Sequence, residues 1–220
     1  MFSEIEKADI FKGIDRLELE KLFEQVTYRK RSFSKGEMAA MVGELCNDLI
    51  IVTEGSVRGE MFDPSGKAVT IDDIKAPQAV ASIFLFGKKH ELPVNIVANE
   101  PATLLYIPRQ SVMRLFSMSP VFLQNYLDDM ANRTHQLALK LRFLSFKTIK
   151  GKIAQFLLDQ MKEPHVVEMA KTQQELAELF GVTRPSLARA LGEMSEKGII
   201  QAGRKKIIIP DVEKLKALKR

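Results

Sequence analysis

The sequence predicts an α+β protein in which an antiparallel β-roll is followed by a long helix and a winged helix-turn-helix. Three observations predict this class. Short apolar runs divided by turn residues fill residues 27–108, leucines recur at heptad spacing after Ser119, and two short amphipathic helices precede a basic hairpin near the C-terminus. We therefore expect three segments, residues 1–118, 119–145 and 146–220.

The first segment begins with a helix and then changes to the period of short strands. The helix is indicated by Leu17, Leu19, Leu22 and Phe23. Turn residues occur at 34–37, at 54–55 and in "DPSG" at 63–66, each between two apolar runs. Closely spaced strands of this kind indicate an antiparallel sandwich or barrel.

The second segment is predicted to be a helix of about 25 residues that begins after Ser119, because Ser119 and Pro120 suit the N-cap and the first helical position. Seven residues then recur at alternating spacings of four and three: Leu123, Leu127, Met130, Thr134, Leu137, Leu141 and Leu144. So narrow a stripe favours pairing with a second copy of the same helix. The alternative is a long helix that lies on its own β-roll.

The third segment contains the pattern of a helix-turn-helix after a helix at 148–161. "TQQE", which starts at Thr172, has the form of a capping box, and Gly181 supplies a helix stop. Thr183 can then cap a second helix. Four residues at helical spacing form its apolar face: Leu187, Ala190, Leu191 and Met194. The alternative is a pair of helices in an all-α domain whose charges are solvated.

The outer face of this second helix suits contact with base edges in the major groove. Arginine can bond guanine O6 and N7 together, and proline is tolerated in a first helical turn. "GIIQAGRKKIIIPD", at 198–211, is predicted to form a wing whose basic tip meets phosphate. We expect the DNA-binding residues to be Thr172, Gln173, Thr183, Arg184, Pro185, Ser186, Ala188, Arg189, Arg204, Lys205 and Lys206.

The distribution of charge agrees with a polyanionic partner for the third segment. Residues 146–220 hold 15 lysines and arginines against 9 acidic residues, a net charge of +6. The first 145 residues hold 18 against 19, a net charge of −1. The positive excess therefore lies where the DNA-binding motif is predicted.

Composition and motifs exclude several other classes of protein. We find no signal peptide and no apolar run long enough to span a membrane, and we expect a cytoplasmic protein without a membrane partner. A single cysteine, Cys46, excludes an internal disulfide and an iron–sulfur cluster held by four cysteines of one chain. Because no phosphate-binding loop, nucleophile elbow or metal-spaced histidine cluster occurs, we expect no enzymatic activity, no catalytic residue and no metal site.

Taken together, these motifs resemble the CRP/FNR superfamily of bacterial transcription regulators. Residues 33–71 are similar to the opening of that family's cyclic-nucleotide-binding-type jelly roll, and residues 103–116 to its last strand and following helix. The heptad helix resembles the dimerisation helix, and residues 172–200 resemble the helix-turn-helix. The resemblance implies a homodimer that binds a pseudo-palindromic site in double-stranded DNA and reorients its helices when its sensor is occupied. RNA polymerase would be a further partner of an activator.

Two departures from the family concern the signal that is sensed. Members that bind cyclic AMP carry a Gly-Glu pair and then an Arg-Ser pair, where Ala81-Ser82 and Leu92-Pro93 stand here. A buried cyclic phosphate would lack its countercharge, which costs several kcal/mol, so we expect no tight binding of cyclic AMP. The effector pocket is predicted to contain Ala81, Ser82, Leu92, Pro93 and Val94. The second departure is that the four cluster cysteines of the FNR branch are missing.

Three hypotheses about the signal stay open. "LPVNIVA", at 92–98, resembles some nitrosative-stress regulators, which leaves a haem-dependent regulator responsive to nitric oxide or redox state, with His90 and His135 as candidate ligands. Cys46 is either a redox switch or a small buried hydrophobic residue. The third hypothesis is an effector-independent dimeric DNA-binding protein.

A further departure from the family concerns the DNA sequence that is read. Pro185 stands where many relatives carry Glu, so we expect a different preferred half-site.

Overall fold

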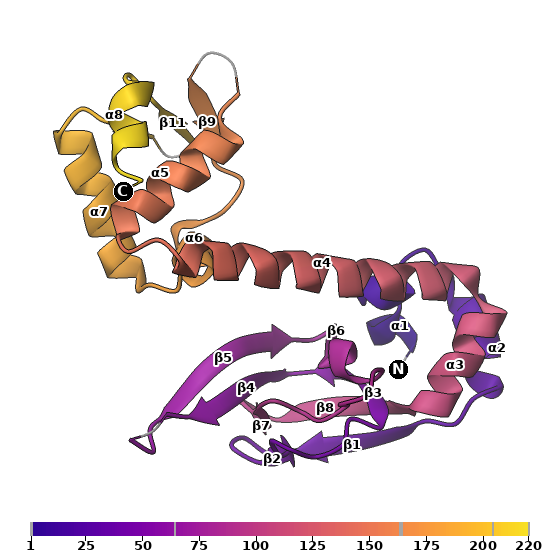
Figure 1. The fold of residues 1–220 in the computed structure, drawn as a ribbon. Coiled ribbons are helices and arrows are strands. Elements are labelled where there is room, and N and C mark those ends of the chain that lie inside the picture. The colour runs from indigo at the N-terminus through magenta and orange to yellow at the C-terminus, as the bar shows by residue number, and fades with distance from the viewer. Residues whose placement is uncertain (1, 64, 163–164, 204, 220) are drawn as a thin grey trace. The chain divides into compact units, whose positions relative to one another are not determined.

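The computed structural model describes residues 2–63, 65–162, 165–203 and 205–219. The chain forms two compact units, Met1–Arg133 and Thr134–Arg220. Helix α4 (Pro120–Leu144) contributes to both units, so the segment 119–145 that the sequence predicts as separate is divided between them (Figure 1).

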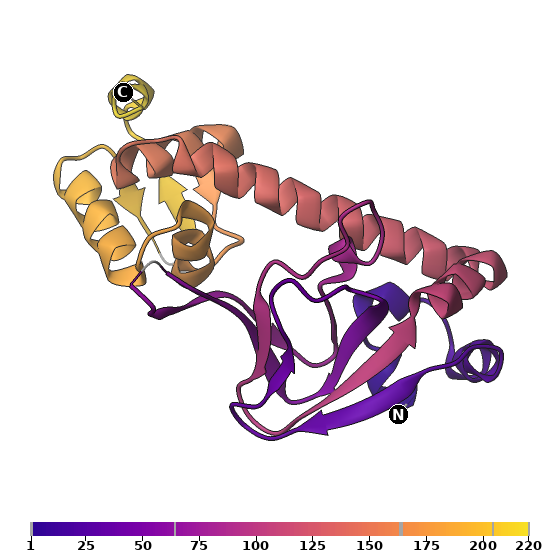
Figure 2. The same ribbon diagram turned by 60° about the horizontal axis from the view of Figure 1, so that its bottom comes forward.

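The first unit is built on two antiparallel four-stranded sheets, which confirms the predicted β-roll (Figures 1 and 2). One sheet has the strand order β1-β8-β3-β6 and the other β2-β7-β4-β5. The strands are Arg29–Phe33 (β1), Met38–Ala40 (β2), Asp48–Glu54 (β3), Ser56–Phe62 (β4), Ala68–Lys75 (β5), Gln78–Val80 (β6), Asn95–Ala98 (β7) and Ala102–Pro108 (β8).

Gly55 makes the turn that leads from β3 into β4, at the break expected from the sequence. Its φ is +74°, a left-handed conformation that glycine adopts at little cost. A Cβ atom built on Gly55 would lie 2.3 Å from the carbonyl oxygen of Pro101, so no other residue fits there without moving the backbone. The turn therefore fixes where the chain passes from one sheet to the other.

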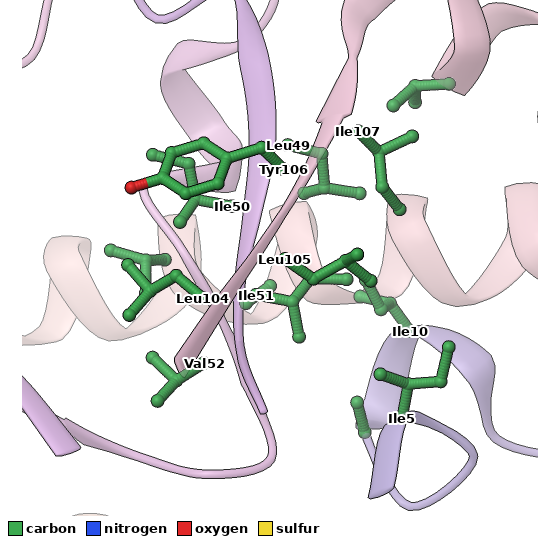
Figure 3. Close-up of a cluster of buried hydrophobic side chains, with 14 of the residues drawn as sticks. Ile5, Ile10, Leu49, Ile50, Ile51, Val52, Leu104, Leu105, Tyr106 and Ile107 are labelled. Atoms are coloured by element: carbon green, nitrogen blue, oxygen red, sulfur yellow. The ribbon is translucent and has the colours of Figure 1, made fainter. Parts of the chain in front are cut away.

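Strands β3 and β8 lie at the centre of their sheet and are buried on both faces, which explains why both are continuous apolar runs. They pair antiparallel, with Ile50 opposite Tyr106 and Ile51 opposite Leu105. Figure 3 shows successive side chains of β8 on opposite sides of the sheet, with Leu105 and Ile107 on the side of Ile10. Burial of each such side chain contributes about 1.5–3 kcal/mol to folding.

Helices of the first unit close one side of the β-roll. They are α1 (Phe2–Ile5), the 3-10 helix η1 (Asp9–Phe11), α2 (Arg16–Glu24), α3 (Arg109–Met118) and the first part of α4. The ring of Phe11 stacks on that of Phe122, with centroids 5.1 Å apart, and Asn125 Nδ2 donates to the carbonyl of Lys12 over 2.7 Å. Leu17 is 70% exposed, whereas Leu19 is buried, because the two lie on opposite faces of α2.

The second unit packs four helices and a small sheet around one core. Its elements are α5 (Ile149–Gln160), β9 (Val166–Glu168), α6 (Gln173–Phe180), α7 (Arg184–Glu196), β10 (Gln201–Ala202), β11 (Lys206–Ile208) and α8 (Val212–Ala217), together with the end of α4. Phe143 of α4 is buried in this core against Phe180, with ring centroids 4.8 Å apart. Strand β9 was not predicted from the sequence.

Candidate nucleic-acid interface and ligand cavity

Helices α6 and α7 form the predicted helix-turn-helix, and side-chain caps fix the start of each helix. Thr172 and Glu175 make the capping box: Glu175 N donates to Thr172 Oγ1 over 3.2 Å, and Thr172 N donates to Glu175 Oε2 over 2.6 Å. The bond from Thr172 N to the carboxylate is the main cause that lowers the pKa of Glu175, and the Thr172 side chain adds to it. Gly181 ends α6 with a φ of +64°, and Thr183 caps α7 by accepting from Ser186 N over 3.4 Å.

Helix α7 presents a short basic face at its N-terminal end. Arg184, Pro185, Ala188 and Arg189 are exposed, while the residues predicted as its inner face are buried. The two arginines take part in no salt bridge among the described residues. Their guanidinium groups are therefore available to base edges and phosphates.

The other predicted residues on these two helices lie around this basic face. Thr172, Gln173 and Thr183 are exposed at the N-terminal ends of α6 and α7. Ser186 is half-buried, and its hydroxyl lies 2.9 Å from the hydroxyl of Thr183. One of these two hydroxyls donates to the other, so Ser186 has a partner within the protein before any phosphate contact.

Lys152 holds the turn from beneath, a role that the sequence analysis missed. This lysine of α5 is 8% exposed, and its Nζ donates to the carbonyl of Phe180, the last residue of α6, over 2.7 Å. A cation at a helix C-terminus is favourable because the last carbonyls carry partial negative charge. The only signal in the sequence is the position of Lys152 beside Ile153 on an otherwise apolar face.

The predicted wing is present, and β9 completes it as a third strand. The sheet has the order β10-β11-β9, and the hairpin closes through a hydrogen bond of 2.8 Å from Gly203 N to the carbonyl of Lys206. Lys205 and Lys206 are exposed at its tip. Arg204, which was also predicted to bind DNA, lies outside the described residues.

The first unit contains an apolar cavity of about 200 Å³ between β4, β5 and the chain that follows β6. Of the five residues predicted for the effector pocket, Ala81, Leu92, Pro93 and Val94 line it. Ser82 is 1% exposed and is turned away, because its hydroxyl donates to Asp129 Oδ2 over 2.8 Å.

A polar network ties this cavity to α4. Arg133 lines the cavity, and its Nε donates to both carboxylate oxygens of Asp129, at 2.9 and 3.0 Å. Its Nη2 donates to the carbonyl of Ala79 over 2.9 Å, and Tyr126 Oη donates to the carbonyl of Ser82 over 2.7 Å. The spacing of Asp129 and Arg133 predicts a helix ion pair, but nothing in the sequence predicts that it borders the cavity.

The candidate sensing residues outside the cavity have different surroundings. Cys46 is buried just before β3, and burial followed by the charge of Asp48 raises the pKa of its thiol to about 11. His90 is half-buried and His135 is exposed, and neither lines the cavity. Among the described residues, no group of three or more His, Cys, Asp or Glu could hold a metal ion.

The heptad residues of α4 leave an apolar surface along the helix. Leu127, Leu137, Leu141 and Leu144 are each more than half exposed, and Thr134 is exposed. Leu123 and Met130 are half-buried, and Met130 packs on the core of the first unit. No helix within the described part of the chain is both long and apolar enough to cross a membrane.

A β-roll joined to a capped helix-turn-helix with a wing defines a class of proteins, the DNA-binding transcription regulators with a sensor of the cyclic-nucleotide-binding type. Comparisons with known proteins give the same class. Residues 30–119 match the cyclic nucleotide-binding domain, and residues 151–218 match the Crp-like helix-turn-helix domain. The chain belongs to the CRP/FNR family of transcription regulators, whose members are not enzymes.

Several relatives support this assignment. The cAMP-activated global transcriptional regulator CRP of Salmonella typhimurium is 25% identical over 173 residues, which are 76% of this chain and 82% of that protein. A transcriptional regulator of Thermotoga maritima is 31% identical, with a TM-score of 0.53, and the match covers 58% of this chain and 97% of that one. The catabolite activator protein of Thermus thermophilus shares the fold, with a TM-score of 0.56 at 22% identity and coverage of 96% and 98%.

Proposed function

We propose that the protein is a homodimeric, sequence-specific transcription regulator that binds a pseudo-palindromic duplex in the cytoplasm and responds to a signal other than cyclic AMP. The observation that carries DNA recognition is the exposed pair Arg184 and Arg189 on α7, beyond a turn held by Lys152 on one side and by the Thr183 cap on the other. RNA polymerase is a further partner if the protein activates transcription.

Dimerisation is supported by the apolar surface on α4. Isolated exposed leucines are common, but a row of leucines at heptad spacing on one helix face is expensive to leave in water. A second copy of α4 would cover the same row by knobs-into-holes packing. The two-fold axis would then place two α7 helices on two half-sites of one duplex.

A signal other than cyclic AMP is supported by the lining of the cavity. Arg133, the one cation among the described residues of the lining, is already paired with Asp129, and the exposed residues Lys88 and Lys89 do not line the cavity. A haem has less support, because neither His90 nor His135 lines this cavity. An effector-independent regulator has less support as well, because it would have no use for the cavity.

The experiment that tests DNA recognition compares three single-site variants on duplexes selected from a random library by the wild-type protein. Arg189→Ala should weaken binding to the selected duplex by about 1–3 kcal/mol, which is roughly 5- to 150-fold in Kd. It should weaken binding to unrelated duplex much less. Lys206→Ala should weaken binding to both duplexes equally, and it should lower the salt dependence of the affinity. Lys197→Ala is the matched control, since it removes one positive charge at the far end of α7.

The outcomes distinguish sequence-specific recognition of DNA from nonspecific electrostatic binding. Equal losses for Arg189→Ala on selected and unrelated duplex, measured at one salt concentration, would contradict base recognition by α7. A wild-type protein that enriches no duplex, and whose weak binding is the same in all three variants, would contradict DNA recognition by this surface altogether.

A further inference from the structure

The cavity of the β-roll differs in chemistry from a site for an anionic ligand. Among the described residues that line it, only Arg133 and Asp72 are charged, and ten of the others have hydrocarbon side chains. The guanidinium of Arg133 is neutralised by Asp129 and also donates to Ala79. Counting Asp72, Asp129 and Arg133 together, an incoming ligand meets a net charge of −1.

The size of the cavity limits the ligand as strongly as its charge. Its volume is about 200 Å³. An apolar protein cavity of about 150 Å³ stays dry and binds benzene, whereas drug-sized ligands occupy sites of roughly 300–1,000 Å³. The cavity therefore has room for one substituted ring or a branched aliphatic molecule of similar size.

One polar group at the cavity can orient such a molecule. Nε and Nη2 of Arg133 are engaged with Asp129 and Ala79, and Nη1 makes no hydrogen bond to any other described residue. An acceptor atom on the ligand can take that remaining donor. A hydroxyl, ether or carbonyl oxygen suits this place, because it brings no negative charge against Asp72.

From these observations we infer that the β-roll cavity binds an uncharged, mainly apolar molecule of about one ring, with one oxygen that accepts from Arg133. This inference rests on the proposed function, in which the β-roll senses a signal other than cyclic AMP, and it names the chemical class of that signal. Because Arg133 belongs to α4 and lines the cavity, the ligand contacts a side chain of α4 directly. Arg133 is in turn linked through Asp129 to Ser82.

The test uses three probes of similar size and different charge on the full-length protein without DNA. Benzyl alcohol is neutral, benzoate is anionic and benzylammonium is cationic at pH 7. Methyl chemical shifts in NMR titrations should show benzyl alcohol binding with a Kd on the order of 1 mM, as expected for a ligand of eight heavy atoms. Benzoate and cyclic AMP should each bind at least tenfold more weakly, because they bring negative charge against Asp72. Benzylammonium should also bind at least tenfold more weakly, because it has no oxygen to accept from Arg133 and its charge would lose water among the hydrocarbon side chains.

Variants of the lining test whether the probe binds in this cavity. Val94→Phe should fill the cavity and weaken the binding of benzyl alcohol at least tenfold. Val69→Phe, the same change at a position of β5 outside the cavity, should alter the Kd of benzyl alcohol less than twofold. Gly59→Ala is a gentler second variant if Val94→Phe fails to fold. Its new Cβ would lie 3.1 Å from Val94 Cγ2, and it should weaken the probe about threefold.

Each contrary result overturns the inference. No shift with benzyl alcohol up to 20-fold above the expected Kd, on the order of 20 mM, would show that the cavity does not take this class of ligand. Benzoate or cyclic AMP that binds as tightly as benzyl alcohol would show that an anion is accommodated. Because DNA is absent, a failure here leaves the Arg189→Ala result untouched, and the reverse also holds.

Discussion

Replacement of Asp129 by alanine should destabilise the first unit by about 2–4 kcal/mol. Asp129 accepts from the hydroxyl of Ser82 and from Nε of Arg133, and the Arg133 and Asp129 side chains are only 24% and 16% exposed. Without the carboxylate, the buried hydroxyl of Ser82 loses its acceptor, which costs about 1–3 kcal/mol. Arg133 keeps only Ala79 as a partner and contributes the remainder of the loss.

Two further variants apportion this loss. Asp129→Asn keeps an acceptor oxygen for Ser82 but loses the ion pair, so we expect a loss of about 1–2 kcal/mol. Asp128→Ala is the matched control, because the neighbouring Asp128 is exposed and, within the described part of the chain, accepts a hydrogen bond only from Gln124 on its own helix. Its loss should stay within about 0.5 kcal/mol. A double-mutant cycle of Asp129→Ala with Ser82→Ala should give a coupling energy of about 1 kcal/mol.

Tyrosine fluorescence is a suitable assay, because it reports on the first unit alone. The chain has three tyrosines and no tryptophan, and Tyr28, Tyr106 and Tyr126 all belong to this unit. Urea unfolding should be followed at one protein concentration, since the stability of a dimer depends on concentration. If Asp129→Ala and Asp128→Ala unfold at the same urea concentration, the hydrogen bonds of Asp129 do not hold the cavity wall to α4.

Three further changes test other parts of the structure. Gly181→Ala should lower thermal stability by about 1–2 kcal/mol, since its φ is +64° and the new Cβ would lie 3.1 Å from Leu144 Cδ2, whereas Gly192→Ala, where no atom lies within 4 Å, should raise it by about 0.5–1 kcal/mol; shifts of the same sign in circular-dichroism melts would contradict this. The thiol of Cys46 has its pKa raised to about 11 by burial, so at pH 8 we expect a thiol reagent to label the folded protein at least 100-fold more slowly than the unfolded chain, and rapid labelling of the native protein would count against this placement. Because the unfolded thiol ionises near pH 8.5, the unfolding free energy should fall as the pH rises from about 8.5 to 11, and Cys46→Ala should remove that part of the fall. Leu137→Glu should abolish the proposed dimer in analytical ultracentrifugation, while Ala138→Glu, on an exposed position beside the heptad row, should leave it intact; equal masses for the two variants would argue against the α4 interface.

Local features of the structure could be predicted from the sequence because their causes are local. Caps and turns depend on residues within four positions of one another, so Thr172 with Glu175 and Ser119 before Pro120 were recognisable. The heptad spacing likewise predicted α4 to within a residue of its observed bounds.

Features that depend on distant contacts were not predictable in this way. Strand β9 is three residues long and is held by its pairing with β11, some 40 positions later, so it leaves no periodic signal. The side chain of Ser82 was assigned to the pocket from its position in the family pattern, but its hydroxyl bonds to Asp129, 47 residues away. The contacts of Lys152 and Arg133 are also with residues distant in the sequence. A charged residue on a helix is usually solvated, so neither contact was predicted.

The two sheets of the β-roll differ in how freely their residues can be replaced. Every interior position of β3 is buried, whereas the first six residues of β5 are exposed, including Ile71 and Asp72, which line the cavity. In a saturation mutagenesis screen, residues 49–52 of β3 should accept only apolar residues of similar volume, while the first six residues of β5 should accept most substitutions. One wall of the cavity can therefore change its chemistry at little cost in stability, so that descendants of this regulator could acquire new ligands while the fold stays the same.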